Sequence, residues 1–317
     1  ITVYDLPIIN SPAAGALTPE AYNGSPYNTT FTVVGGIPTY VWSQPIGTLP
    51  PGLSLNTSTG VLSGTPSATG NFSFSIRVTD GNSDVDTKAY TLQVLDAPAI
   101  SSPAPGALPP ATRNAPNWQQ AFSATGGKTP YAWSATGLPT GMTINTSTGL
   151  ISGTPTASGN FNINVTLTDA NSQTDVNAYT LVVNAAVTIV GTSLPDAEEE
   201  VAYSQTPTVT GGTAPFTWSM LVNPANADLT MDPSTGLISG TPAANSGGNY
   251  TVTVTVTDTH GGTANKALTL LITLPGGGTA ANCGCNSRAT TTDVAFGGWL
   301  WLLLPLVLLA VRRRAVV

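Results

Sequence analysis

One block of sequence occurs three times along the 317-residue chain, at intervals of about 88 residues. Its first landmark is a Gly-Gly pair followed by an aromatic residue and a tryptophan, at 35–42, 126–133 and 211–218. The second is STG-[VL]-[LI]-SGTP at 58–66, 147–155 and 234–242, and the third is a Thr-Asp pair ending at Asp80, Asp169 and Asp258. Three landmarks in one order predict tandem copies of a small domain, not a single large core.

Each copy has the pattern of β-structure. Apolar and polar residues alternate along 72–78, 161–167 and 250–256, and again along 90–94, 179–183 and 268–272. A period of two is typical of half-buried strands, so each copy should contain a long antiparallel pair. Only 8% of residues are charged, whereas Gly and Pro are abundant, which disfavours surface helices. The sequence therefore predicts an all-β fold.

The rest of each copy adds shorter strands. In the first copy, Leu53–Leu55 and 61–63 flank a turn that ends at Gly60 and predicts a hairpin. With 29–34, 39–43 and a short opening strand near Ile8, each copy has about seven strands, the number in an immunoglobulin-like sandwich. The tryptophans of the first landmark are then expected to lie buried between two sheets: Trp42, Trp133 and Trp218.

These motifs together resemble the immunoglobulin-like repeats of bacterial surface proteins, which are related in architecture to cadherin-like domains. The resemblance covers 8–272 and implies three tandem sandwiches. Residues 1–9 are similar to 92–100, the junction between two copies, so the chain is expected to begin in the last strand of a preceding repeat. The expected domains are 1–7 (end of that repeat), 8–97, 98–185 and 186–273 (three repeats), 274–294 (a Gly-rich linker) and 295–317 (a transmembrane helix and its stop).

The C-terminal segment differs from the repeats. A Cys-Gly-Cys motif, Cys283 to Cys285, precedes an uncharged apolar run of 17 residues, 295–311, which Arg312, Arg313 and Arg314 end. This length is close to the minimum for a membrane-spanning helix, and the arginines should stay cytoplasmic, which leaves the repeats outside the cell.

This order of motifs resembles the tripartite sorting tail of myxobacterial surface proteins, called MYXO-CTERM. The resemblance implies that a sorting protease removes the helix and that Cys283 or Cys285 becomes the modified anchor. A retained single-pass anchor in the envelope membrane is the alternative.

Neither composition nor motifs indicate catalysis. Residues 1–282 carry 15 acidic and 5 basic side chains, which excludes a basic nucleic-acid-binding face. The only histidine, His260, lies in a predicted turn and is expected to be solvated there, and the equivalent residues of the other copies are Asn82 and Asn171. Because no histidine, Cys/His cluster or nucleotide-binding loop recurs, we expect a protein that is not an enzyme and requires no cofactor.

Acidic residues suggest one possible ion site. In a seven-strand sandwich the loop after the sixth strand lies at the same pole as the entry linker. The residues expected to gather there are Asp5, Asp80 and Asp84, with Asp86 nearby, in the first copy, and Asp96, Asp169 and Asp175 in the second. Carboxylates at a junction suit Ca²⁺, which would stiffen the array. The alternative is that they cap turns and keep the surface soluble. The run 198–200, at the other pole, is interpreted as a solvated acidic face.

Three functions remain open on this basis. The repeats form a cell-surface stalk that projects a more N-terminal region; or they form an adhesin, stiffened by calcium, that binds a polysaccharide or a protein; or they are accessory modules of a secreted hydrolase whose catalytic domain lies outside this chain. The expected location is the outer envelope, with the repeats extracellular.

Overall fold

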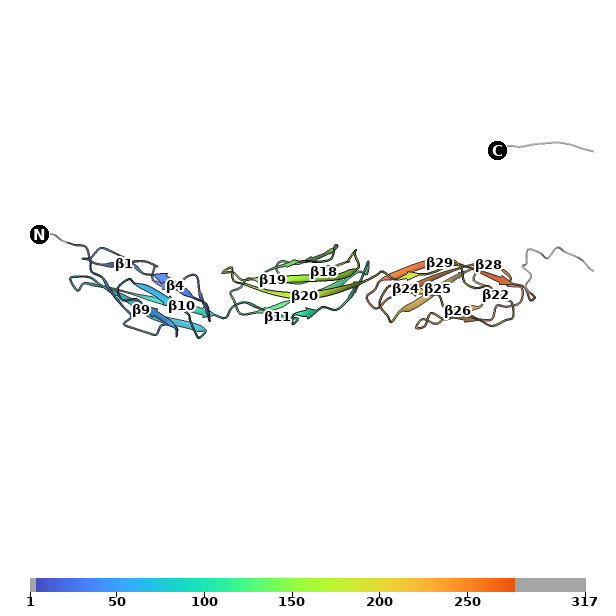
Figure 1. Ribbon diagram of the computed structural model, residues 1–317, viewed down its shortest axis with the longest axis horizontal. Helices are drawn as coiled ribbons and strands as arrows, with labels where there is room; N and C mark the ends of the chain where they lie inside the picture. Colours follow the sequence, from blue (N-terminus) through green and yellow to red (C-terminus); the bar gives the residue numbers. More distant parts are fainter. Residues whose placement is uncertain (1–3, 277–317) are drawn as a thin grey trace, which may run out of the picture.

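The computed structural model describes residues 4–276, which form three β-sandwiches arranged end to end (Figure 1). Each sandwich is one sequence repeat, and no helix occurs within this described part. The predicted all-β fold is therefore confirmed for the repeats. Accordingly, residues 4–276 include no helix long and apolar enough to cross a membrane. The tail at 283–314, including the predicted spanning segment, lies outside the described residues.

Repeat 1 contains β1 (Ile8–Ser11), β2 (Gly15–Ala16), β3 (Ala21–Tyr22), β4 (Tyr27–Thr30), β5 (Thr32–Val34), β6 (Val41–Ser43), β7 (Leu53–Leu55), β8 (Val61–Gly64), β9 (Gly70–Thr79) and β10 (Val85–Leu95). Repeat 2 contains β11 (Ala99–Ser102), β12 (Gly106–Ala107), β13 (Ala111–Thr112), β14 (Trp118–Ala121), β15 (Ser123–Thr125), β16 (Ala132–Thr136), β17 (Met142–Ile144), β18 (Leu150–Gly153), β19 (Gly159–Thr168) and β20 (Thr174–Asn184). Repeat 3 contains β21 (Thr188–Ile189), β22 (Ala197–Glu198), β23 (Tyr203–Gln205), β24 (Val209–Thr210), β25 (Thr217–Asn223), β26 (Leu229–Met231), β27 (Ile238–Gly240), β28 (Gly248–Thr257) and β29 (Thr263–Thr273).

The three repeats share one topology. In repeat 1 the larger sheet has the order β2-β10-β9-β6, with β3 also paired to β10, and the smaller sheets are β4-β8-β7 and β1-β5. Repeat 2 has the same arrangement, with β12-β20-β19-β16 and β13 also paired to β20, β14-β18-β17 and β11-β15. In repeat 3 the larger sheet is β22-β29-β28-β25, where β22 is the counterpart of β3, and the smaller sheets are β23-β27-β26 and β21-β24. The predicted antiparallel pairs are the central hairpins β9-β10, β19-β20 and β28-β29.

The opening strand differs from the expectation. A single strand near Ile8 was predicted, but this region forms three short strands, β1, β2 and β3. Pro12 follows β1 directly and Pro19 lies between β2 and β3. Because proline has no N–H for a strand ladder, the chain leaves the smaller sheet and joins the larger one, where β2 and β3 run parallel to β10.

Each repeat has its own hydrophobic core. The clusters of buried side chains contain residues of one repeat each, drawn from both of its sheets. The three predicted tryptophans belong to these cores, with exposed fractions of 3% for Trp42, 5% for Trp133 and 8% for Trp218. Their predicted burial is confirmed, and each repeat buries its apolar surface independently of its neighbours.

The STG landmark forms the turn that covers the core tryptophan. In repeat 2 the side-chain oxygen of Asn145 accepts the N–H groups of Ser147 and Thr148, both at 3.0 Å. Gly149 follows with φ of +69°, and a Cβ there would lie 2.8 Å from Cε2 of Trp133. Only glycine supplies both the left-handed backbone and the space for the indole ring.

Candidate functional site

The Thr-Asp landmark fixes one pole of each repeat. Asp169 is 5% exposed, and its Oδ2 accepts the N–H of Lys128 at 2.9 Å. Its Oδ1 accepts the N–H groups of Asn171 and Gln173, both at 2.9 Å. Asp80 and Asp258 accept three equivalent backbone bonds in their own repeats. The aspartate therefore holds the Gly-Gly turn against the hairpin turn, at the pole that meets the preceding repeat.

The linkers are bonded to the same pole. The N–H of Gly127 donates to the carbonyl of Asp96 at 2.7 Å, and the N–H of Gly212 donates to that of Ala185 at 2.8 Å. Before repeat 1, Gly36 and Asp5 form the same bond at 2.7 Å. Because the linker carbonyls are bonded to the Gly-Gly turn of the next repeat, successive repeats follow one another without a free spacer.

Five polar side chains connect repeats 1 and 2. Tyr22 in β3 and Glu20 just before that strand meet three residues of repeat 2: Lys128, Asp169 and Asn171. The carboxylate of Glu20 accepts bonds from Nζ of Lys128 and, at 3.0 Å, from Nδ2 of Asn171. The hydroxyl of Tyr22 donates to Oδ2 of Asp169. We call these five residues the first-junction clasp.

The clasp shifts the pKa values of its members. Burial alone would raise the pKa of Asp169, but the bonds from Tyr22 and from three backbone N–H groups outweigh it, so the pKa lies below its ordinary value. The pKa of Glu20 is also lowered, because the bonds from Lys128 and Asn171 outweigh its burial. Burial, and then the bond to Asp169, raises the pKa of Tyr22. At neutral pH the clasp therefore contains two carboxylates and a neutral phenol.

The junction between repeats 2 and 3 uses different side chains. Thr112, which occupies the position of Tyr22, is fully buried, and its hydroxyl lies 3.2 Å from the hydroxyl of Thr213 and 3.4 Å from Nδ1 of His260. Nδ2 of Asn184 donates to the hydroxyl of Thr213 at 2.7 Å. These contacts include no carboxylate and no ammonium group, so the second junction has hydroxyl, amide and imidazole groups where the first has carboxylates and an ammonium.

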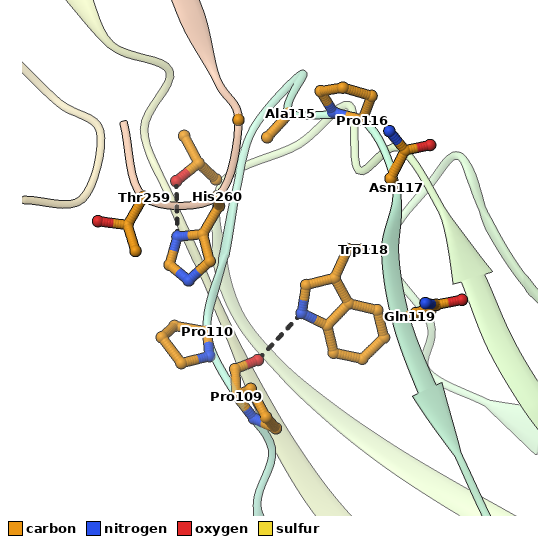
Figure 2. Close-up of a pocket in the computed structure, with 11 residues that line it drawn as sticks. Pro109, Pro110, Ala115, Pro116, Asn117, Trp118, Gln119, Thr259 and His260 are labelled. Atoms are coloured by element: carbon orange, nitrogen blue, oxygen red, sulfur yellow. Dashed lines mark hydrogen bonds between the residues drawn. The ribbon is translucent and has the colours of Figure 1, made fainter. Parts of the chain in front are cut away.

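A cleft lies at the same place in both junctions. At the first, it measures about 230 Å³ and is lined by Glu20, Tyr22 and Asn171, among others. At the second, it measures about 360 Å³. Figure 2 shows its walls: His260 and Pro110 on one side, Trp118 facing them, and Ala115 and Pro116 above.

Each of the three repeats matches a known family of domains. Residues 6–95, 97–184 and 186–273 each match the He_PIG family model, described as "Putative Ig domain". The chain belongs to this family. Its three He_PIG repeats have an immunoglobulin-like fold that is typical of non-catalytic modules and consistent with an extracellular stalk or adhesion module.

Solved structures show similar folds. An I-band fragment of titin is 13% identical, with 85% of this chain and 99% of that chain covered and a TM-score of 0.44. A fragment of mouse cadherin-23 is 17% identical, with 85% and 99% covered and a TM-score of 0.32. An endo-fucoidan hydrolase from glycoside hydrolase family 107 is 18% identical, with 81% and 43% covered and a TM-score of 0.29. At these identities the similarity concerns the fold alone. No curated protein matches the chain.

The residues predicted to bind calcium have several roles in the He_PIG repeats. Asp80 and Asp169 cap turns, as described above. Oδ2 of Asp175 accepts the N–H of Ile100 at 2.7 Å, and Asp86 makes the equivalent 2.8 Å bond to Ile9 in repeat 1. The other predicted residues have exposed side chains: Asp5, Asp84 and Asp96. Within residues 4–276 no three His, Cys, Asp or Glu side chains gather as a metal site would need. Calcium binding stays a prediction.

Two expectations about surface residues were wrong. The run 198–200 was interpreted as a solvated face, but Glu199 is only 4% exposed, and its carboxylate accepts the N–H of Gly247. His260 was expected to be solvated in its turn, but it is half-buried against Thr112 of the preceding He_PIG repeat. Both residues lie at poles, where loops far apart in sequence meet.

Proposed function

We propose that the three He_PIG repeats form a non-enzymatic extracellular spacer, which holds a more N-terminal region of the protein away from a bacterial envelope. The supporting observation is that separate cores are joined end to end by bonded linkers and by contacts at both junctions. A spacer needs a fixed length and resistance to folding back. Short linkers whose carbonyls are bonded to the next repeat supply both properties.

Small-angle scattering tests the rod. Each repeat contains a strand of 11 residues, β10, β20 or β29, which at ~3.3 Å per residue is about 36 Å long. Three repeats in line then give a length of about 110 Å and a radius of gyration of about 32 Å. A single compact domain of this size would have a radius of about 19 Å. For residues 1–276 in solution, a value near the compact one would refute the spacer.

The proposed anchor is the C-terminal tail with Cys283 and Cys285. Its support is the order of the Cys motif, the apolar run and the arginine cluster in the sequence. The double variant Cys283→Ser/Cys285→Ser should release the repeats into the medium if a modified cysteine holds them. Retention of that variant in the membrane fraction would favour an uncleaved spanning helix. Protease added to intact cells should cleave repeats that lie on the cell surface. Repeats that remain intact in this assay would contradict the surface location.

A further inference from the structure

We propose that the cleft between repeats 2 and 3 binds a neutral oligosaccharide. The cleft joins aliphatic and aromatic surfaces from β14 and its preceding loop to amide, hydroxyl and imidazole groups from both repeats (Figure 2). This inference goes beyond the spacer, because it gives one junction a ligand.

The lining of the cleft is apolar with a polar rim. The apolar part comprises three prolines, including Pro110 and Pro116, with Ala115 and the indole ring of Trp118. The polar groups belong to Asn117, Gln119, Thr259 and His260. A sugar ring has the matching surfaces, since its C–H faces are apolar and its edge carries hydroxyl groups.

The absence of charge in the lining limits the class of ligand. No Asp, Glu, Lys or Arg lines this cleft. An ionic ligand would lose hydration there without gaining a counter-charge, which disfavours phosphates, nucleotides and acidic peptides. A neutral ligand with several hydroxyl groups avoids that cost and can use the amides of Asn117 and Gln119.

The first junction shows how such a cleft is closed. Glu20 precedes β3 at the position where Pro110 precedes β13. Lys128 and Thr213 both donate their N–H to the buried aspartate of their repeat, and Asn171 and His260 both lie two residues after that aspartate. At the first junction Glu20 and Lys128 form an ion pair between the two repeats, and the cleft measures about 230 Å³. Without that pair, the cleft at the second junction measures about 360 Å³, within the usual range for small ligands.

The orientation of the aromatic wall is fixed in advance. Nε1 of Trp118 donates to the carbonyl of Pro109 at 3.1 Å, and the residue is only 9% exposed. A side chain held in place before binding loses little entropy when a ligand arrives. The indole and the proline rings therefore form a rigid surface.

A second cleft shares part of its lining with the first. It measures about 490 Å³, shares Asn117, Trp118 and Gln119 with the first, and is lined on its other side by Ser152, Gly153 and Thr154. Its surface is mainly polar backbone and hydroxyl groups. An apolar cleft and a polar cleft with a shared lining fit an extended chain of sugar units better than a single ring.

The test uses ¹H–¹⁵N NMR of the three-repeat protein, residues 1–276, observed at the indole N–H of Trp118 and the amide of His260. The probes are disaccharides of glucose, mannose, galactose and N-acetylglucosamine at millimolar concentration. We expect saturable shifts of both signals with at least one probe. No shift with any of the four, or equal shifts spread over all repeats, would overturn the site.

Two variants locate the binding. Pro110→Glu/Thr213→Lys transfers the charged pair of the first junction into the second and should weaken binding by about tenfold or more. Because that pair could disturb the junction, Gln119→Ala is the milder variant, and Asn28→Ala at the equivalent exposed position of repeat 1 is its control. The proposal would be refuted if Asn28→Ala weakened saccharide binding as much as Gln119→Ala does. It would also be refuted if neither variant of the second-junction cleft weakened binding. A protein that binds no saccharide but keeps an extended radius of gyration would retain the spacer role alone.

Discussion

Replacement of the buried aspartate of repeat 2 should unfold that repeat selectively. In Asp169→Ala three backbone N–H groups, of Lys128, Asn171 and Gln173, lose their acceptor inside a pole that is closed by repeat 1. Each unsatisfied buried donor costs about 1–3 kcal/mol, so the free energy of unfolding should fall by ~3 kcal/mol or more. Tyr22→Phe removes only the bond that crosses the junction, and should lower the stability by about 1.5–3 kcal/mol, as expected for a bond to a charged acceptor.

Urea denaturation with hydrogen exchange measured by mass spectrometry can separate these effects. Amides of 126–133 and 165–175 should lose protection in Asp169→Ala at urea concentrations where repeats 1 and 3 remain protected, because each repeat has its own core. The control is Gln173→Ala, whose exposed side chain lies in the same turn while its N–H stays available to Asp169, and which should change stability by less than ~0.5 kcal/mol. Equal stability of Asp169→Ala and the control would refute the capping role.

Three other experiments test the Gly149 turn, the pH dependence of the first junction and calcium binding. Gly149→Ala places a Cβ 2.8 Å from an indole carbon at a positive φ, so the melting midpoint of repeat 2 should fall, with a cost of more than ~1 kcal/mol; an unchanged midpoint would contradict the turn geometry. Because the folded pKa values of Glu20 and Asp169 are lowered, their stabilisation of the first junction is complete above about pH 5 and is lost as the pH falls through the folded values. Scattering from pH 7 to pH 2 should show that repeats 1 and 2 become less aligned, and Tyr22→Phe should reduce this response. If calcium binds beside Asp5 or Asp96, millimolar Ca²⁺ should raise the melting midpoint relative to a chelator, and an unchanged midpoint removes calcium from the linkers.

The repeats, the central hairpins and the buried tryptophans could be predicted because local patterns determine them. Alternation over 72–78 fixes which face of a strand is buried, and the landmarks recur in order. The broken opening strand was less predictable. Pro12 and Pro19 indicate interruptions, but only the assembled sandwich shows that the chain changes sheets between them.

The junctions were not predicted, for a physical reason. Glu20, Tyr22 and Lys128 are ordinary surface residues in any single repeat, and they meet only because two domains have a fixed mutual placement. The sequence held one indication of the junctions. When the three copies are aligned, one position at the pole is occupied by Tyr22, Thr112 and Glu198, so residue identity differs between copies at the poles, whereas the core residues stay similar. For Asp80 and Asp169 the turn-capping alternative could be predicted, because the turn residues after each of them offer N–H donors at the spacing of a side-chain-capped turn.

The parallel pairing of β12, near the start of repeat 2, with the last strand β20 has a mechanical consequence. Because β12 runs alongside β20 in the same direction, the two ends of a repeat leave from opposite poles, and traction on the chain is directed along the strands. The hydrogen bonds between them are then loaded in shear and must break together, not one after another. A string of such units should transmit tension to whatever it carries with little extension until a whole unit gives way.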